Sequence, residues 1–328
     1  MYKPIIRNKK FITYDEKPVY SDDYHASSDD LKNPVCLAIV MQGQIKLQND
    51  FTYETLKLYK KTFKDCPLIL STWKTEDQKA IEKIKSLGVD VILNDDPSVK
   101  DFTNINRQIF STQHGLAFAK TKGVDYVIKT RTDQRLYETN IPEYLFNVLK
   151  TFPAYDGNVQ KSRLITISFN TFKYRLYDIN DMFLFGHIDE VIKFWSCEFE
   201  TRTEIPKFDN LLEYCKWRPS EIYFTTEYLK KLGYKYDWTL KDSWNAYARY
   251  FCVIDSESVG FYWPKYFNFT NYWRNFLGAN PELEELTFKE WLNLYAGIDN
   301  KINIADKSLV DGFENNSTLK LNNDYFIM

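Results

Sequence analysis

The chain has 328 residues, and its 43 lysines and arginines nearly balance its 45 aspartates and glutamates, which gives a formal net charge of −2 at pH 7. A chain of this charge has no general attraction to nucleic acid or to an anionic membrane, so we expect neither as a partner. The sequence contains no run of about 20 apolar residues and no signal-peptide pattern at its start. These features exclude an ordinary membrane-spanning helix and predict a cytoplasmic protein.

The first 33 residues are polar and rich in turn-forming residues, and we expect them to form an N-terminal extension. From residue 34 the pattern becomes regular. Apolar runs predict strands at residues 35–41, 68–71, 89–93 and 126–128, and apolar residues at helical spacing predict helices at residues 51–64, 76–87 and 104–122. This alternation requires crossover connections and therefore predicts an α/β fold, with a parallel sheet covered by helices on both faces.

Beyond residue 150 the regular alternation ends. Strands are predicted at residues 164–169 and 181–185, and helices at residues 191–199, 221–232 and 281–296. Between residues 234 and 276 more than a third of the positions are aromatic, without a helical or strand period. These rings could line an acceptor groove, but for most of them we favour a satellite core that covers the edge of the sheet.

The most informative segment runs from Tyr126 to Arg135, where an apolar strand leads directly into charged and amide side chains. Ligands of parallel α/β sheets bind outside the carboxyl ends of the strands, so polar side chains at this place are expected to meet a substrate. In an extended chain, Arg131, Asp133 and Arg135 would point to one side. One carboxylate between two guanidiniums can bind a phosphate directly and a divalent cation through the acid. The alternative interpretation is a solvated turn.

Candidate polar residues also occur on predicted helices and strands further along. The third predicted helix places four polar side chains on one face, which are Asn104, Arg107, Gln108 and Ser111. A solvent-facing stripe would look the same. Asp181 begins a strongly apolar segment, where a carboxylate must be hydrated or paired. Glu221 begins a predicted helix, where the helix dipole favours an acid and where a carboxylate could also take a proton from a substrate hydroxyl.

Five segments form a recognisable set, namely Ala38–Gly43, Ser71–Trp73, Asn104–Gln108, Arg131–Asp133 and Asn180–Gly186. Together they resemble the WavE family of lipopolysaccharide-synthesis proteins over about residues 34 to 235. That family is similar to nucleotide-sugar-dependent glycosyltransferases of the GT-A type, which implies a Rossmann-type α/β/α sandwich with a mixed, mainly parallel sheet. The implied domains are an extension over residues 1–33, a GT-A-like catalytic domain over 34–235, and an aromatic-rich C-terminal part over 236–328 that packs on the same domain.

The resemblance also implies roles for particular residues. Those expected to bind the donor are Gln42, Gly43, Thr72, Trp73, Asn104, Arg107, Gln108, Arg131, Asp133 and Arg135. Asp133 stands at the second acid of the Asp-x-Asp motif that GT-A enzymes usually carry, and it would bind Mn²⁺ or Mg²⁺. Arg131 replaces the first acid and could itself neutralise part of the diphosphate. The candidate catalytic carboxylates are Asp181, which the resemblance places in the active site, and Glu221.

We therefore expect an inverting glycosyltransferase that moves a sugar from a nucleotide-sugar donor to a growing bacterial surface polysaccharide, either lipopolysaccharide or capsule. Its partners would be the donor and a saccharide acceptor, and other proteins could hold it at the inner face of the inner membrane. Two alternatives stay open. A sugar-phosphate nucleotidyltransferase would be expected to carry a glycine-rich basic loop after the first strand, where residues 41–46 contain a single glycine. A non-catalytic carbohydrate-binding or scaffold protein would explain the missing first acid.

Overall fold

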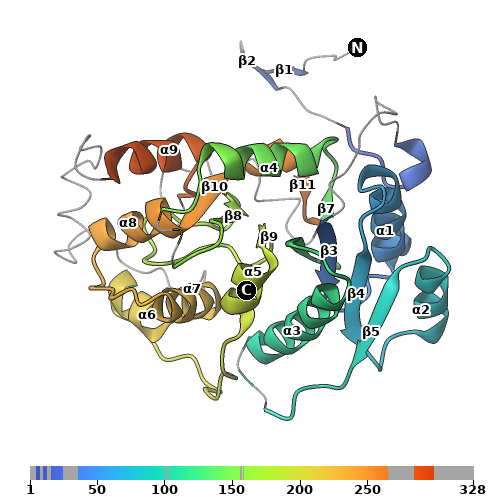
Figure 1. Cartoon of the computed structure of the whole chain (residues 1–328), viewed down its shortest axis with the longest axis horizontal. Coiled ribbons are helices and arrows are strands. Elements are labelled where there is room, and N and C mark those ends of the chain that lie inside the picture. The colour runs from blue at the N-terminus through green and yellow to red at the C-terminus, as the bar shows by residue number, and fades with distance from the viewer. Residues whose placement is uncertain are drawn as a thin grey trace.

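In the computed structural model, the order of the strands determines where each candidate residue lies. The structure describes residues 16–24, 36–99, 101, 103–155, 157, 159–264 and 284–298, together with the backbone of a hairpin formed by β1 (Ile5–Arg7) and β2 (Lys10–Ile12). A seven-stranded sheet lies at the centre, in the order β10-β8-β9-β6-β3-β4-β5 (Figure 1). Its strands are β3 (Leu37–Gln42), β4 (Leu68–Trp73), β5 (Asp90–Asn94), β6 (Tyr126–Arg131), β8 (Leu164–Ile167), β9 (Leu184–His187) and β10 (Phe251–Ile254).

The sheet is mixed and mainly parallel. β3, β4, β5 and β6 pair in parallel, and β10 pairs in parallel with β8. Only β9, among these seven strands, runs against both of its neighbours, β6 and β8. A second, two-stranded sheet pairs β7 (Arg135–Leu136) with β11 (Phe261–Tyr262) in antiparallel fashion. The fold class predicted from the sequence, including the mixed character of the sheet, is confirmed.

Helices cover both faces of the sheet. They are α1 (Phe51–Thr62), α2 (Gln78–Lys85), α3 (Ile105–Thr121), α4 (Ile141–Thr151), α5 (Ile188–Trp195), α6 (Leu211–Trp217), α7 (Ser220–Lys231), α8 (Leu240–Tyr250) and α9 (Phe288–Gly297). α3, α5 and α7 pack side by side, while α4 and α9 lie on the side of the sheet away from α3 (Figure 1). Every residue of β3 and β4 is buried, as expected for parallel strands that are covered on both faces.

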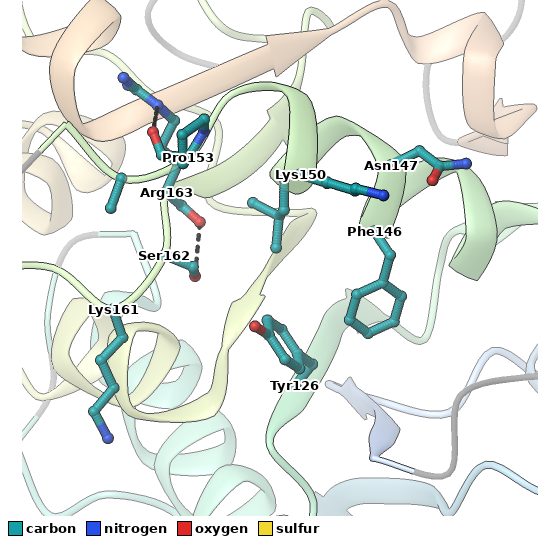
Figure 2. A pocket seen from close by; sticks show the side chains of 10 residues that line it. Tyr126, Phe146, Asn147, Lys150, Pro153, Lys161, Ser162 and Arg163 are labelled. Atoms are coloured by element: carbon teal, nitrogen blue, oxygen red, sulfur yellow. Dashed lines mark hydrogen bonds between the residues drawn. The ribbon is translucent and has the colours of Figure 1, made fainter. Parts of the chain in front are cut away.

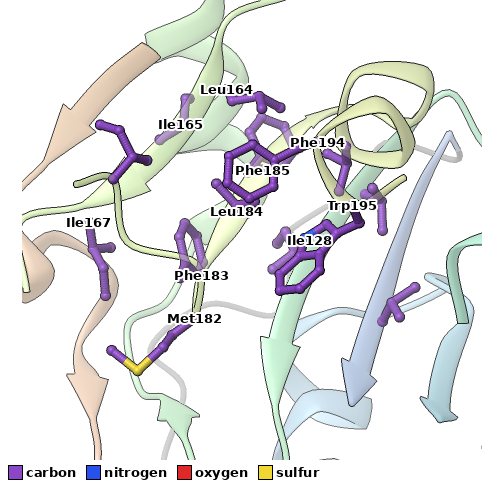
Figure 3. Packing of buried hydrophobic residues seen from close by; sticks show 14 of the residues in the cluster. Ile128, Leu164, Ile165, Ile167, Met182, Phe183, Leu184, Phe185, Phe194 and Trp195 are labelled. Atoms are coloured by element: carbon purple, nitrogen blue, oxygen red, sulfur yellow. The ribbon is translucent and has the colours of Figure 1, made fainter. Parts of the chain in front are cut away.

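A buried apolar cluster lies on both faces of β6 and β9. Phe185 of β9 pairs with Ile128 of β6 and packs against Phe146 of α4, while Trp195 of α5 covers Lys129 on the opposite face of β6 and packs beside Phe194 (Figure 3). Ile128, Phe185, Phe194 and Trp195 are fully buried. Burial of a large apolar side chain contributes roughly 1.5–3 kcal/mol, so this cluster anchors β9 against the parallel half of the sheet. The loop that precedes β9 is thereby fixed at the carboxyl end of β6.

The predicted elements of the first half agree with the observed strands and helices to within about three residues. The second half agrees less well. α4, α6, α8 and β10 were not predicted, and the strand predicted at residues 181–185 is in fact β9, so that Asp181 lies in the turn before it. β10, in the aromatic-rich part, forms the edge of the main sheet. The first residues of the helix predicted at 281–296, and the last part of the aromatic-rich stretch from residue 265, lie outside the described residues.

Gly115 of α3 sets how closely that helix approaches the sheet. A Cβ atom at this position would lie 2.6 Å from Cγ1 of Val40 in β3 and 3.2 Å from Cβ of Ser71 in β4. The helix could accept the added methyl group only by moving away from two central strands. The absence of a side chain at position 115 therefore permits the observed packing.

We predict that Gly115→Ala lowers the free energy of unfolding by about 1–3 kcal/mol, because overpacking a filled interface forces the helix outward. Urea denaturation monitored by circular dichroism would measure the change. Gly157→Ala is the matched control, since nothing lies within 4 Å of a Cβ built there and its effect should stay within about 0.5 kcal/mol. Equal stability of the two variants would contradict the close packing of α3.

Candidate active site

The order of the strands sets a switch point between β3 and β6, the place where open α/β sheets form a crevice. From β3 the chain moves outward through β4 to β5, and it then returns to the other side of β3 as β6. Ligands of open α/β sheets bind at such a switch point, outside the carboxyl ends of the strands. The last residues of the two strands, Gln42 and Arg131, are register partners. The candidate residues after β3 and after β6 are therefore neighbours in space.

Gly43 begins the loop after β3 in a conformation that favours glycine. Its φ is +121°, and a Cβ atom there would lie 2.8 Å from Oγ1 of Thr132 in the turn after β6. The Thr132 hydroxyl donates a hydrogen bond to the carbonyl of Gln44, which ties the two loops together. The backbone of this loop is thus held close to the end of β6, as a site for a phosphate or a ribose requires.

Arg131 and Asp133 form an ion pair at the mouth of the crevice. Arg131 Nε donates to Asp133 Oδ1 and Arg131 Nη2 to Oδ2, each at 3.0 Å. The indole Nε1 of Trp263 also donates to Oδ2 at 3.0 Å, and the Arg131 guanidinium lies 5.5 Å from the centre of the Trp263 ring. The Arg131 side chain is 23% exposed and that of Asp133 11% exposed. Asp133 is therefore held on both oxygens, whereas Arg131 reaches the surface.

The charges around this pair fix its ionisation. Burial by itself raises the pKa of Asp133, but the charge and hydrogen bonds of Arg131, the Trp263 indole and the charge of Lys46 lower it further, so the net shift is downward. Burial lowers the pKa of Arg131, and the Asp133 carboxylate outweighs that effect and raises it. Both groups are therefore charged near neutral pH.

Lys129 places a buried ammonium group next to this pair. It is the third-last residue of β6 and fully buried, and its Nζ donates to the backbone carbonyl of Asp181 at 2.6 Å and lies 4.2 Å from the centre of the Trp195 ring. Burial, opposed by the charge of Asp181 and assisted by that of Arg131, lowers the pKa of Lys129 to about 7. Lys129 thus fastens the loop before β9 to the end of β6.

Two carboxylates act on the pair, Asp181 from the loop before β9 and Glu221 from the first turn of α7. Asp178, in the same loop, forms an ion pair with Arg175 at 3.7 Å. Asp178 and Asp181 are only 3% and 2% exposed, and one oxygen of each, Oδ1 of Asp178 and Oδ2 of Asp181, accepts no hydrogen bond from the described residues. Burial and then the charge of Asp181 raise the pKa of Glu221 to about 7. Burial and the charge of Glu221 raise the pKa of Asp178 well above its usual value. Glu221 can therefore exchange a proton near neutral pH.

The structure brings together four of the predicted site residues: Arg131, Asp133, Asp181 and Glu221. Arg131 interacts electrostatically with all three acids. Sequence reasoning missed Lys129 and Asp178 as members of this group, and it did not connect Trp263 with Asp133. Lys129 did stand out as a charged residue within an apolar strand, which is the signal that could have found it. No local signal marks Trp263, because its partner is 130 residues away in the chain.

A second set of predicted residues lies at the ends of β3 and β4. Ser111 of α3 donates to the side-chain carbonyl of Gln42 at 2.9 Å, and Thr72 donates to Glu76 at 3.2 Å. Trp73 is 5% exposed, and the guanidinium of Arg107 covers its ring at 4.9 Å. A base can stack on Trp73 only if Arg107 moves.

Arg107 has a partner of its own at the surface. Its Nε and Nη2 donate to the two carboxylate oxygens of Asp96 at 2.6 and 2.7 Å. Asn104 is exposed in a left-handed conformation at the start of α3, and Oε1 of Gln108 is buried without a hydrogen-bond donor among the described residues. Gln108 is therefore the residue of this helix face with an unused buried acceptor.

Arg135 does not belong to the site, and its predicted position was wrong. A turn at residues 132–133 interrupts the extended chain, so the two-residue alternation does not continue from Arg131 to Arg135. Arg135 is 1% exposed, and its guanidinium donates to the Thr55 hydroxyl at 2.9 Å, to the Val19 carbonyl at 2.7 Å and to the Phe51 carbonyl at 3.1 Å. It attaches the N-terminal segment to α1 and has a structural role.

The residues present do not fit a metal site. Both oxygens of Asp133, the predicted ligand, already accept hydrogen bonds from Arg131 and Trp263. Within the described ranges, no group of three or more His, Cys, Asp or Glu side chains has an arrangement that could hold a metal ion. A divalent cation at Asp133 would also meet the charge of Arg131 directly. We therefore derive no chemical step through a metal.

A cavity of about 390 Å³ lies at the amino end of β6, away from the carboxyl end that carries Arg131. Its walls include Tyr126 at the start of β6, Phe146 and Lys150 of α4, and Ser162 before β8 (Figure 2). The length of β6, roughly 17–20 Å at about 3.3 Å per residue, separates it from Asp133. His187 pairs with Tyr126 at this same end of β6, and its side chain accepts a hydrogen bond from Asp189 N at the start of α5. It has a structural role as a helix cap.

A family model for WavE lipopolysaccharide synthesis matches residues 37–317. The chain belongs to this family. The resemblance predicted from the five segments is thus confirmed, and the match extends beyond residue 235 through most of the aromatic-rich part. A comparison with curated protein sequences finds no significant match.

Solved structures similar to this WavE chain include a cytidylyltransferase from Leptospira borgpetersenii, with 17% identity over 50% of this chain and 66% of that one, at a TM-score of 0.33. A glycosyltransferase involved in glycosylation of the major capsid of PBCV-1 has 14% identity over 49% and 65%, at a TM-score of 0.27. Core-mannan synthase A from Aspergillus fumigatus, solved in an Mn/GDP form, has 10% identity over 80% and 87%, at a TM-score of 0.34. The first two are matched over just under two thirds of their length. The fold rests on the strand order described above.

Among the described residues of the chain, no helix is both long enough and apolar enough to cross a bilayer.

We predict that Glu221→Gln makes the protein more stable than the wild type at pH 8 and nearly equal to it at pH 4. The folded-state pKa of Glu221, raised to about 7, exceeds its unfolded value, so the wild type loses stability as pH rises between about 4.5 and 7. The expected difference is about 1–3 kcal/mol in urea denaturation at pH 8. Glu143→Gln, at an exposed position of α4, is the control and should show no such pH dependence. A constant difference across this range would contradict the buried environment of Glu221.

We predict that Arg135→Met destabilises the fold by roughly 2–5 kcal/mol, because it removes the buried guanidinium whose hydrogen bonds join Thr55 and Phe51 of α1 to Val19 of the N-terminal segment. Thermal unfolding of the purified protein would measure this loss. If Arg135 instead bound the donor, the substitution would weaken ligand binding while leaving the melting temperature unchanged.

Proposed function

We propose that the chain is a nucleotide-sugar-dependent glycosyltransferase that acts in the synthesis of a bacterial surface polysaccharide. The observation that carries this proposal is the meeting of a surface-reaching guanidinium, Arg131, with the buried carboxylate of Asp181 and the half-buried carboxylate of Glu221 at the switch point of the sheet. A diphosphate leaving group requires fixed positive charge, and an acceptor hydroxyl requires a base. Membership of the lipopolysaccharide-synthesis family supports the choice of substrate class.

The reaction would be a displacement at the anomeric carbon of the donor sugar. The acceptor oxygen forms a bond to this carbon and gives its proton to a carboxylate, while the bond to the diphosphate oxygen breaks with its electron pair and the nucleoside diphosphate leaves. One base suffices for a single displacement, which inverts the anomeric configuration. Glu221 is the better candidate for this base, because a pKa of about 7 combines proton affinity with a sufficient charged fraction at neutral pH.

Buried polar atoms without hydrogen-bond partners near the end of β6 favour the binding of a ligand rich in hydroxyl groups. Both amide atoms of Gln134, the residue after Asp133, are buried without partners in the described part of the chain, as is one oxygen of Asp181. An unsatisfied buried polar atom costs about 1–3 kcal/mol, so a ligand that supplied donors and acceptors would recover this energy. A saccharide has hydroxyl groups that can do both. We propose that the acceptor sugar lies near Gln134 and Asp181.

The donor would lie across the ends of β3 and β4, with its diphosphate at Arg131. Gln42, Gly43, Thr72 and Trp73 would then surround the nucleoside, and Gln108 would add a buried acceptor. The loop after β3 has one glycine and is tied to Thr132, unlike the glycine-rich loop expected in a nucleotidyltransferase. The site of action proposed for the protein is the cytoplasm, with partners holding it at the inner membrane face.

We predict that a nucleotide-sugar in one of the UDP, GDP, CDP, dTDP or CMP series stabilises the protein, by about 2.7 kcal/mol at 100 times its dissociation constant. Glu221→Gln should retain this thermal shift and lower the release of nucleotide in the presence of acceptor by about a hundredfold or more, as expected for loss of a general base. Glu143→Gln is again the matched control. Normal turnover of Glu221→Gln would remove this residue as the base, and absence of any shift in the whole panel would favour the scaffold alternative.

A further inference from the structure

We propose that the Arg131 guanidinium takes the place of a divalent cation, so that the diphosphate of the donor binds without a metal. This inference rests on the proposed function and specifies how its donor is held. It assigns Asp133 and Trp263 as positioning residues, which orient Arg131 rather than touch the donor through a metal.

The hydrogen bonds of Asp133 are the first reason. A carboxylate that binds Mg²⁺ places an oxygen about 2.0–2.1 Å from the ion, with a lone pair directed at it. Here Nε and Nη2 of Arg131 approach the two Asp133 oxygens edge to edge, and the Trp263 indole takes a further position on Oδ2. An ion at this carboxylate would have to displace the guanidinium or lie against it. The guanidinium of Arg131 thus already occupies the place beside Asp133 that a bound cation would take.

Lys46 is the second reason. Its charge lowers the pKa of Asp133, so it lies close enough to act on the pair from the loop after β3. The carboxylates of Asp181 and Glu221 also act on Arg131 and keep its guanidinium charged. A diphosphate at the exposed edge of Arg131 would be attracted by this guanidinium and by Lys46.

The free side of the guanidinium is the third reason. Asp133 uses Nε and Nη2, and Nη1 donates to none of the described residues. A guanidinium has five N–H donors in one plane, so the edge that Asp133 does not occupy can bind two phosphate oxygens at once. The side chain is 23% exposed, and its residue pairs with Gln42 across the switch point. The open edge of Arg131 is thus available where the nucleotide would lie.

Trp263 contributes by limiting the orientation of the pair. Its indole fixes Asp133 at Oδ2, and its ring lies 5.5 Å from the guanidinium. Arginine loses conformational freedom on binding, and a neighbour that holds the guanidinium in advance reduces that loss. Pre-organisation of Arg131 by a carboxylate and an indole gives a fixed cation at the edge of the crevice.

The test is isothermal titration of UDP, GDP, CDP and dTDP into the full chain, once in EDTA and once in Mn²⁺ or Mg²⁺. We expect one of these nucleotides to bind in EDTA with an affinity within about threefold of that in metal. Arg131→Ala should weaken this binding by about ten- to a hundredfold, as expected for loss of charge-assisted bidentate hydrogen bonds. Arg131→Lys, which keeps the charge and is the milder substitution for folding, should recover only part of it.

Two further variants, Asp133→Asn and a control at another arginine, distinguish metal-free binding through Arg131 from metal binding through Asp133. If Asp133 positions Arg131, Asp133→Asn weakens nucleotide binding equally in EDTA and in metal. Arg249→Ala, on α8 at a hydrogen bond to Asn245, should leave binding unchanged. Binding that requires Mn²⁺ or Mg²⁺, is lost in Asp133→Asn and is retained in Arg131→Ala would overturn the inference while leaving the proposed function intact. Failure of every nucleoside diphosphate to bind in either condition would overturn both.

Discussion

The guanidinium of Arg131 and the carboxylate of Asp133 meet edge to edge, 3.0 Å apart at both contacts, where β6 ends. Burying a charge without a partner is costly, so neither side chain could occupy this place without the other. Their geometry also needs Trp263, which comes from beyond β11 and donates to the same carboxylate. The crevice at the switch point is therefore built from segments 130 residues apart in the chain, and the aromatic-rich part contributes directly to the candidate site.

Two arginines four residues apart show how context decides the role of the same side chain. Arg131 is paired with a carboxylate and keeps an exposed edge. Arg135 is enclosed by hydroxyl and carbonyl acceptors and by the ring of Phe51, with no exposed edge. Arg163 behaves like Arg135, since it donates to the carbonyls of Pro153, Ala248 and Arg249. Within the described residues, an arginine saturated by backbone carbonyls holds segments together, whereas the one at the crevice is suited to an anion.

The carboxylates around Arg131 differ in the direction in which their pKa values are shifted. The pKa of Asp133 is lowered by its cation, whereas the pKa of Glu221 is raised by burial and the charge of Asp181, and the pKa of Asp178 by burial and the charge of Glu221. Groups whose environments push their pKa values apart can perform different tasks in one reaction. In the proposed transferase, Asp133 stays charged and holds Arg131, and Glu221 accepts the proton of the acceptor. Lys129 keeps the loop that carries Asp181 in contact with the end of β6.

By itself the sequence determined the alternation of strands and helices up to β6, the polar cluster at the carboxyl end of that strand, and the family. These features are local: apolar periodicity, turn residues and short motifs can each be read within about fifteen residues. The tertiary structure alone decided that β9 runs antiparallel, that α4, α8 and β10 complete the sheet and its cover, and which charges meet. Arg135 was misplaced because one turn at residues 132–133 reverses the direction in which later side chains point. Trp263, Asp178 and Lys129 were not recognised as neighbours because contacts between distant segments depend on strand order and register, which local patterns do not specify.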